Sequence, residues 1–264
     1  MPRPAEHRPN SSDREVPAIA PPPAGTVERF CLDLIGATRL ADKVEPAPPP
    51  DPRSDASWEQ HAPARRVAAP GRPPELEVVR KSPRTPPVGA WTRPEARARV
   101  LATCVHHELQ AAELFAWAVL AFPREPRDFR AGLVRLCLEE LEHLRVYAAQ
   151  LSRLGFAVGA FPVRDWFWHR VPACTTAVQY VAFMGMGLEG GNLDHTERYA
   201  AWLRDVGDLE GAAIQDRVHR EEIPHVRFGC RIINNCFSFS QNSCHDRVFS
   251  SGDARFSKQH FSAS

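Results

Sequence analysis

Four glutamates and two histidines recur in a fixed order along this chain of 264 residues. In that order they are Glu108, Glu140, His143, Glu189, Glu222 and His225. Each half of the pattern reads Glu, then Glu-x-x-His, with 32 residues between the two glutamates in the first half and 33 in the second. Such a spacing covers about one helix, a turn and half of the next helix, and it indicates a duplicated helical hairpin. Two Glu and two Glu-x-x-His units on four helices are the ligands of a carboxylate-bridged dimetal centre.

The faces that carry these six residues are mostly apolar. Residues three, four and seven positions apart share one face of a helix, and around Glu108 that face carries Leu101, Val105 and Phe115. The same rule gives apolar neighbours for the other five residues. A buried, unpaired carboxylate costs several kcal/mol, so four of them in one core require cations.

Metal ions would supply those cations. Carboxylate oxygens with one imidazole per metal suit iron or manganese. We therefore expect two metal ions, with iron favoured and manganese or a mixed manganese–iron pair as alternatives. A different interpretation is a bundle whose mid-helix acids pair with buried Arg or His, which is a common use of an isolated core carboxylate. Six candidates at a duplicated spacing favour the metal centre.

Prolines set the limits of the helical region, because 20 of the 25 lie before residue 95 and runs of proline cannot belong to helices or central strands. We expect residues 1–90 to be a Pro-rich, largely extended or disordered segment. One short amphipathic helix is predicted within it, over 26–43, where apolar residues return at helical spacing. Residues 44–90 are expected to be an arm wrapped over the surface or a mobile linker.

Four longer helices are predicted within residues 91–230, over about 92–122, 127–155, 176–206 and 209–230. Thr92 and Thr176 each precede Glu or Gln by three residues, which predicts a capping box at both positions. Gly207 can end the third helix and Asp208 can cap the fourth. Short, long and short connections are typical of a ferritin-like antiparallel four-helix bundle with one long crossover. The predicted fold class is all-α.

The last part of the chain, residues 231–264, differs in composition from the rest, being rich in Ser and Phe and without Leu, Glu or Pro. We interpret it as a disordered or out-of-frame extension. The alternative is a metal-binding tail, but its candidate ligands match no zinc spacing: Cys230, Cys236, Cys244 and His245. Pro224, between two candidate ligands, predicts a bend or an unwound turn, and we expect the fourth helix to end near residue 230.

Composition excludes several partners. The net charge is +1 with acids and bases nearly balanced, so nothing favours nucleic acid or an anionic membrane. The N-terminus lacks the apolar core of a signal peptide, and the longest apolar run, 114–122, is too short to span a bilayer. Seven scattered cysteines fit a reducing compartment. We expect a cytoplasmic protein.

Four segments resemble the ferritin-like superfamily, and more narrowly its branch called domain of unknown function 455: 106–118, 138–147, 188–196 and 219–229. The resemblance implies a di-iron carboxylate bundle with the six residues above as ligands. Glu139 and Glu221 precede ligand glutamates, as in the soluble di-iron oxygenases, where the leading acid bonds the ligand His of the opposite helix. The alternative for both is a solvated surface acid.

Several other residues near the candidate ligands have both a functional and a purely structural interpretation. Tyr147 lies one turn beyond His143 and could supply a proton or an electron, although such a Tyr is more often core. His219 lies one turn before Glu222 and is a candidate to support the ligands. For His106 and His107 we favour structural roles. The aromatic residues 166–168 could cap a pocket, although packing on the bundle exterior is more common.

These observations favour a redox enzyme in which two metals use dioxygen on a small-molecule or nucleoside substrate, with a separate electron donor. Neither the substrate nor the donor follows from the sequence, and a homodimer is compatible with it. The alternatives are a metal-storage or ferroxidase protein, and an inactive helical scaffold with a vestigial site.

Overall fold

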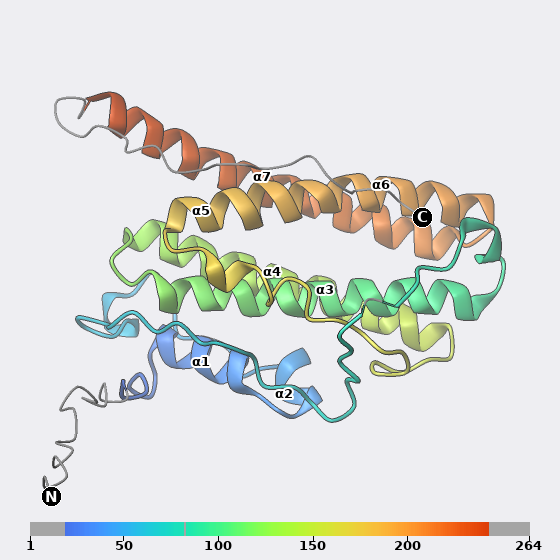
Figure 1. Ribbon diagram of the computed structural model, residues 1–264, viewed down its shortest axis with the longest axis horizontal. Coiled ribbons are helices and arrows are strands. Elements are labelled where there is room, and N and C mark those ends of the chain that lie inside the picture. The colour runs from blue at the N-terminus through green and yellow to red at the C-terminus, as the bar shows by residue number, and fades with distance from the viewer. Residues whose placement is uncertain (1–18, 82, 243–264) are drawn as a thin grey trace, which may run out of the picture.

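The chain folds into helices joined by turns and extended segments (Figure 1). The computed structural model describes residues 19–81 and 83–242, the last eight by their backbone alone. Within these ranges there is no β-strand, only a parallel bridge between Val78 and Val163. The predicted all-α class is confirmed. In chain order the elements are α1 (Val27–Gly36), α2 (Leu40–Val44), η1 (Asp55–Ser57), η2 (Val88–Ala90), α3 (Pro94–Ala121), α4 (Arg127–Arg153), η3 (Val171–Ala173), α5 (Ala177–Val181), η4 (Ala182–Leu188), α6 (Glu189–Asp205) and α7 (Leu209–Asn242).

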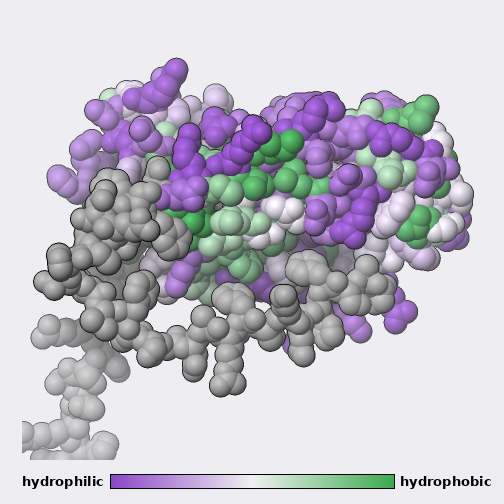
Figure 2. All heavy atoms as spheres, turned by 90° about the horizontal axis from the view of Figure 1, so that it is seen from above, coloured by the Kyte–Doolittle hydropathy of each residue, from purple (hydrophilic) through white to green (hydrophobic). Residues whose placement is uncertain are grey.

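Two helical hairpins form the body of the molecule. Helices α3 and α4 pack along each other through a turn at 122–126, and α6 and α7 do so through a turn at 206–208. A long connection, 154–176, leads from the first hairpin to the second (Figure 1). The face seen from above in Figure 2 is largely hydrophilic, as expected where helices turn their apolar sides inward. Of the helices in the described ranges, none has the length and apolar content to cross a bilayer.

The first turns of α3 and α5 test the two predicted capping boxes. Helix α3 begins at Pro94, whose fixed φ suits a first turn, but its N-cap is Arg93, which makes no side-chain cap. The capping box predicted at Thr92 is therefore wrong. The Oγ1 of Thr176 accepts a hydrogen bond from the N–H of Gln179 at 3.2 Å, which confirms Thr176 as the N-cap. The Gln179 side chain accepts from the N–H of Thr175 instead of Thr176, so the second half of the predicted capping box is not formed.

Helix α7 starts as predicted and ends later. Gly207 has a φ of +79°, and Asp208 accepts a hydrogen bond from the N–H of Gly211 at 2.9 Å. The helix then passes Pro224 without an unwound turn and continues to Asn242. Both the unwinding predicted at the proline and the end predicted near residue 230 are wrong.

Packing explains why α7 continues. The Phe228 ring stacks on Phe129 with centroids 6.1 Å apart, and a Cβ on Gly132 would lie 2.4 Å from that ring. Ile232 and Ile233 pack against the same core, so the apolar stripe of the helix runs past residue 230. The remaining candidates for a metal-binding tail lie outside the described side chains: Cys236, Cys244 and His245.

The predicted helix over 26–43 is two helices, α1 and α2. The carbonyl of Leu34 accepts a hydrogen bond from the Lys43 Nζ at 2.8 Å, and the carbonyl of Ile35 accepts from Lys43 Nζ and from the N–H of Gly71, both at 2.8 Å. These donors take the last carbonyls of α1, and Ala37 is already extended. The break therefore comes from tertiary contacts that apolar spacing does not encode.

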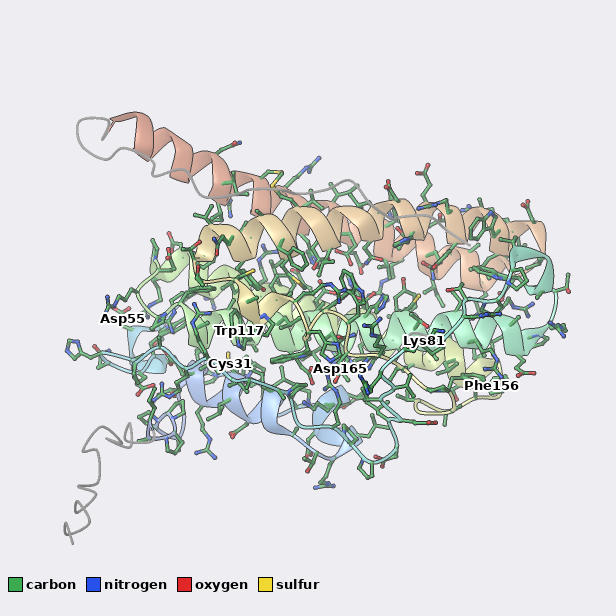
Figure 3. All side chains as sticks on the ribbon, in the orientation of Figure 1. Cys31, Asp55, Lys81, Trp117, Phe156 and Asp165 are labelled. Carbon is green, nitrogen blue, oxygen red and sulfur yellow. The ribbon has the colours of Figure 1, made fainter. Side chains whose placement is uncertain are left out.

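A buried network of charges fastens the N-terminal arm to the bundle. Lys43 Nζ lies 2.6 Å from Glu113 Oε1, and Arg72 donates to Glu113 at 2.7 Å and to Asp165 at 2.9 Å. Lys43 and Glu113 are fully buried. Burial lowers the pKa of Lys43, and the adjacent Glu113 carboxylate opposes that effect. Asp165 lies on the long connection (Figure 3) and also contacts His106 Nε2 at 2.8 Å, so one network joins α2, the arm, α3 and the connection.

Two of the three apolar clusters in the described part of the interior meet along α3 and α4. The first takes α3 from Ala111 onward with the start of α4, and the second takes α3 up to Leu109 with the end of α4 from Leu144. The boundary between them falls at Gln110 on α3, two residues after Glu108, and between Leu141 and Leu144 on α4, where His143 lies. The candidate ligands therefore lie at the level where the two apolar clusters meet.

Replacing Glu113 with Gln tests the buried network. The change leaves Lys43 and Arg72 without their shared carboxylate, and we expect a loss of about 3–5 kcal/mol in the free energy of unfolding. The matched control is Glu95→Gln on the same helix, which removes only an exposed ion pair with Arg99, at a cost of about 0–1 kcal/mol. Denaturant unfolding measures both, and equal stability of the two variants would contradict the role of the network.

Candidate metal centre

The six predicted ligands converge at one place in the interior. They come from α3, α4, α6 and α7, and each is at most 4% exposed. Two groups of four have one ligand atom per residue, all within 4.8 Å of one another. The first group is Glu108, Glu140, His143 and Glu222, and the second is Glu140, Glu189, Glu222 and His225.

Glu140 and Glu222 belong to both groups. A carboxylate has two oxygens and can give one to each of two metals, so these residues are placed as bridges. Glu108 and His143 complete the first group, and Glu189 and His225 complete the second. Each half of the duplicated sequence pattern therefore supplies three residues of one candidate ligand set, and each set also includes the shared glutamate of the other half.

Both imidazoles turn the same nitrogen toward the shared carboxylates. His225 Nδ1 lies 2.9 Å from Glu140 Oε1 and from Glu222 Oε2, and His143 Nδ1 lies 3.4 Å from Glu140 Oε2 and from Glu222 Oε1. The two rings stack with centroids 5.7 Å apart. Nδ1 is therefore the nitrogen that would face a metal ion.

Several of these inward atoms make no hydrogen bond within the described residues, although they lie within ion-pair distance of one another: both oxygens of Glu140, Oε2 of Glu222, and Nδ1 of His143 and of His225. A buried polar atom without a partner costs about 1–3 kcal/mol, and more when charged. Five such atoms around one point are the expected result where a cation completes the site. The donor set therefore fits metal ions.

Without metal, protons balance the charges. Burial raises the pKa of Glu108 and of Glu189, and nearby carboxylates add to the effect, which favours the neutral acid. Burial lowers the pKa of His143, but its contacts with Glu140 and Glu222 outweigh this and raise it to about 11. Burial raises the pKa of Glu140, while His225 and His143 outweigh it and lower the pKa. Metal binding would replace the protons on the histidines.

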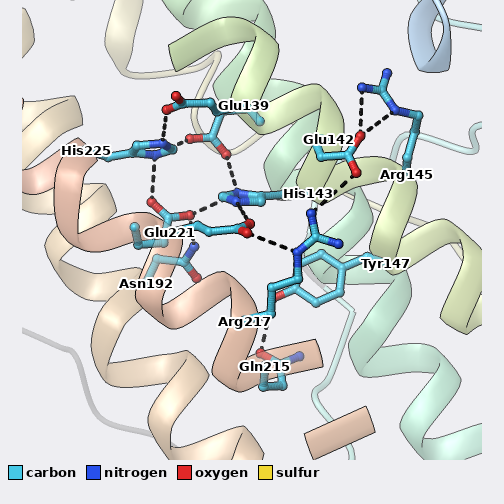
Figure 4. A network of polar contacts seen from close by, with 12 residues as sticks. Glu139, Glu142, His143, Arg145, Tyr147, Asn192, Gln215, Arg217, Glu221 and His225 are labelled. Carbon is cyan, nitrogen blue, oxygen red and sulfur yellow. Dashed lines mark hydrogen bonds and ion pairs between the residues drawn. The ribbon is translucent and has the colours of Figure 1, made fainter. Parts of the chain in front are cut away.

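The outer nitrogen of each imidazole meets a carboxylate from the opposite helix (Figure 4). Glu221 of α7 lies 3.1 Å from His143 Nε2, and Glu139 of α4 lies 2.8 Å from His225 Nε2. This is the reciprocal contact that the resemblance implies. A carboxylate on the outer nitrogen fixes the tautomer and makes the ligand more basic. Both acids are half-exposed, at 39% for Glu139 and 43% for Glu221.

An arginine four residues earlier holds each of these acids. Arg135 donates to Glu139 at 3.0 Å, and Arg217 donates to Glu221 at 3.0 Å. The duplicated pattern is therefore longer than predicted, reading Arg-x-x-x-Glu-Glu-x-x-His in both halves. The signal was present in the sequence, and alignment of the two halves would have found it.

Tyr147 and His219 lie near the centre without contacting a ligand through a hydrogen bond that the structure shows. The Tyr147 hydroxyl donates to Gln215 Oε1 at 3.1 Å, and burial raises its pKa well above the usual value. His219 Nδ1 lies 3.1 Å from the Thr196 hydroxyl and from a carbonyl of α6. Sequence reasoning missed Asn192, whose Nδ2 donates to Glu222 Oε1 at 2.9 Å.

A π-helical segment, η4, places Glu189. The N–H of Glu189 donates to the carbonyl of Met184, five residues back. In a π turn each N–H bonds the carbonyl five residues back instead of four. The residue five positions before Glu189 therefore lies where an α-helix would put the residue four positions before it. Met184 is accordingly buried, while Met186, which an α-helix would place beside Glu189, is 44% exposed. The helical spacing of the sequence predicts Met186 on the buried face of Glu189, and this prediction is wrong.

The aromatic residues of the long connection divide between two roles. Trp168 is buried and donates through Nε1 to Glu113 Oε2 at 2.7 Å. Trp166 and Phe167 line a cavity beside the candidate centre, and His107 stacks on Phe167. Trp166 and Phe167 therefore lie at a pocket, which was one of the two alternatives for these aromatic residues. The structural role expected for His106 fits its contact with Asp165.

Neutralising Glu221 tests its support of His143. We expect Glu221→Gln to weaken metal binding about 10–100-fold, because the outer nitrogen loses its charged partner. Glu142→Gln is the control, since Glu142 contacts Arg145 and Arg217 but no ligand. Chelator competition measures both affinities. If the two variants lose the same amount, the contact with His143 has no special role.

The comparisons with known proteins give a family and no assigned activity. The family model described as protein of unknown function, DUF455, matches residues 37–258. No curated protein matches the chain, and no solved structure does. The matched range covers most of the chain and includes the four helices that carry the candidate ligands, so the protein belongs to the DUF455 family.

Proposed function

We propose that the protein binds two metal ions in a ferritin-like bundle, within the unit formed by residues 91–230. The proposed ligands are the six residues at the meeting point of the helices: Glu108, Glu140, His143, Glu189, Glu222 and His225. The observation that carries the proposal is the pair of four-residue groups that share Glu140 and Glu222. A site for one metal ion would not need two carboxylates that belong to both groups. Nor would it need two imidazoles whose outer nitrogens each contact an acid.

We propose iron as the metal, with manganese or a mixed pair as alternatives. The ligand set holds four carboxylates and two imidazoles and no thiolate. Hard oxygen donors with imidazole suit iron and manganese, whereas soft thiolates would favour zinc or copper(I). The burial of all six side chains supports tight binding, because the apoprotein keeps unpartnered polar atoms that a metal would satisfy.

The proposed activity is that of an oxidoreductase with dioxygen as oxidant. Bound iron would supply the electron transfer to dioxygen that side chains cannot perform. The chain's own residues have defined tasks. Glu139 and Glu221 orient the imidazoles, the two apolar clusters exclude water, and the cavity at Glu108 and Glu189 admits a small organic substrate. An external electron donor supplies the electrons that the substrate does not.

Iron loading followed by exposure to oxygen tests this function. We expect about two ferrous ions per chain, rapid oxygen consumption, and a change in the optical spectrum on oxidation. Glu140→Ala and His143→Ala should lose both properties, whereas Glu142→Ala, on the same helix and partly exposed, should keep them.

Two other results would contradict the proposal. Equal and negligible iron in the wild type and the variants would indicate a helical scaffold with a vestigial site. Continued uptake of many iron ions per chain, with oxidation and mineral formation, would indicate metal storage instead.

A further inference from the structure

A cavity of about 300 Å³ lies beside the candidate metal centre. Of the six candidate ligands, only Glu108 and Glu189 line it. The two imidazoles do not line it, and their outer nitrogens contact Glu221 and Glu139. The centre therefore has one side closed by ion pairs and one side that opens into a chamber. A volume near the lower end of the range for ligand sites indicates a small molecule.

One wall of the chamber is aromatic. The rings of His107 and Phe167 are stacked with centroids 4.8 Å apart, and Trp166 meets Phe167 edge-on at 5.7 Å. The guanidinium of Arg170 lies over the Trp166 ring, 3.8 Å from its centroid. Aromatic faces prefer offset-stacked or edge-to-face aromatic partners, beyond what burial alone contributes.

The wall is also fixed in place. Asp165, directly before Trp166, takes hydrogen bonds from Arg72 at 2.9 Å and contacts His106 at 2.8 Å. The N–H of Phe167 donates to Gln110 Oε1 at 3.0 Å. These contacts tie the connection to the arm and to α3. The chamber is therefore preformed, which lowers the entropic cost of binding.

Helix α6 has a glycine, which carries no side chain, at the wall of the same chamber. Gly191 lines it, and a Cβ built there would have no neighbour within 4 Å. Gly185 differs, since its Cβ would meet the backbone of Gly229 at 3.4 Å. A glycine inside a helix costs about 0.5–1 kcal/mol relative to alanine. Packing does not explain this cost at Gly191, and because Gly191 lines the chamber, a side chain there would enter it.

We propose that this chamber binds a planar aromatic or heteroaromatic small molecule, with its ring against Phe167 and Trp166 and its edge toward Glu108 and Glu189. Its role as the substrate site rests on the proposed dimetal function. The binding itself does not, because the walls belong to the protein alone. Gly191 is the position that leaves room for the ring.

Calorimetric titration with a planar probe and a non-planar one tests the proposal. The probes are 2-naphthol and its saturated counterpart, decahydro-2-naphthol. We expect 2-naphthol to bind about 2–10-fold more tightly, because the aromatic ring gains contacts with Phe167 and Trp166 that the saturated ring cannot make. Gly191→Leu should weaken 2-naphthol binding about tenfold or more, because the added side chain fills the chamber. Gly191→Ala should show a smaller loss in the same direction and covers the case in which the Leu variant misfolds.

Gly190→Leu is the matched control. Its Cβ would also meet nothing within 4 Å, but Gly190 does not line the chamber, so it should bind the probe like the wild type. Equal binding of the two probes, or unchanged 2-naphthol binding in Gly191→Leu and Gly191→Ala, would overturn the proposal. Metal content is measured on the same preparations. Probe binding by a protein that holds no metal supports the chamber and overturns the dimetal function. Metal binding without probe binding supports the dimetal function and overturns the chamber proposal.

Discussion

The structure depends on one electrostatic constraint, which is that four carboxylates at the centre of the bundle must be neutralised. Glu108, Glu140, Glu189 and Glu222 are at most 4% exposed, and charges removed from water are costly unless paired. Two histidines supply part of the compensation, and their outer carboxylates fix which nitrogen faces inward. The remaining unpartnered atoms leave room for cations of higher charge. The duplicated halves meet because both contribute ligands to this one point.

A second buried set of charges controls what lies around the centre. Glu113 joins Lys43, Arg72 and Trp168, and Asp165 joins Arg72 to His106. Through these contacts a proline-rich arm becomes part of the fold, and the long connection is held over α3. The same connection brings Trp166 and Phe167 to the cavity. The charge network around Glu113 and Asp165 thus positions the residues that line the cavity beside the candidate metal ligands.

The sequence predicted what depends on local periodicity. The helical spacing around Glu108, Glu140 and Glu222 placed these residues on buried faces, and short and long connections indicated two hairpins. It did not predict the π turn before Glu189, because the extra residue leaves no mark in an apolar pattern of period 3.6. It left open whether residues 44–90 form a wrapped arm or a mobile linker, since Lys43 and Arg72 are anchored by residues distant in sequence. The end of α7 was misjudged from composition, although Phe228 and Ile232 continue its apolar stripe.

The most direct test of the central claim is the anomalous-scattering map of a crystal of the iron-loaded protein, recorded on both sides of the iron absorption edge. We expect two peaks about 3.5–4 Å apart, with Glu140 and Glu222 between them, the Nδ1 atom of His143 beside one peak and that of His225 beside the other. A single peak, or iron bound away from these residues while they remain paired with one another, would contradict the central claim.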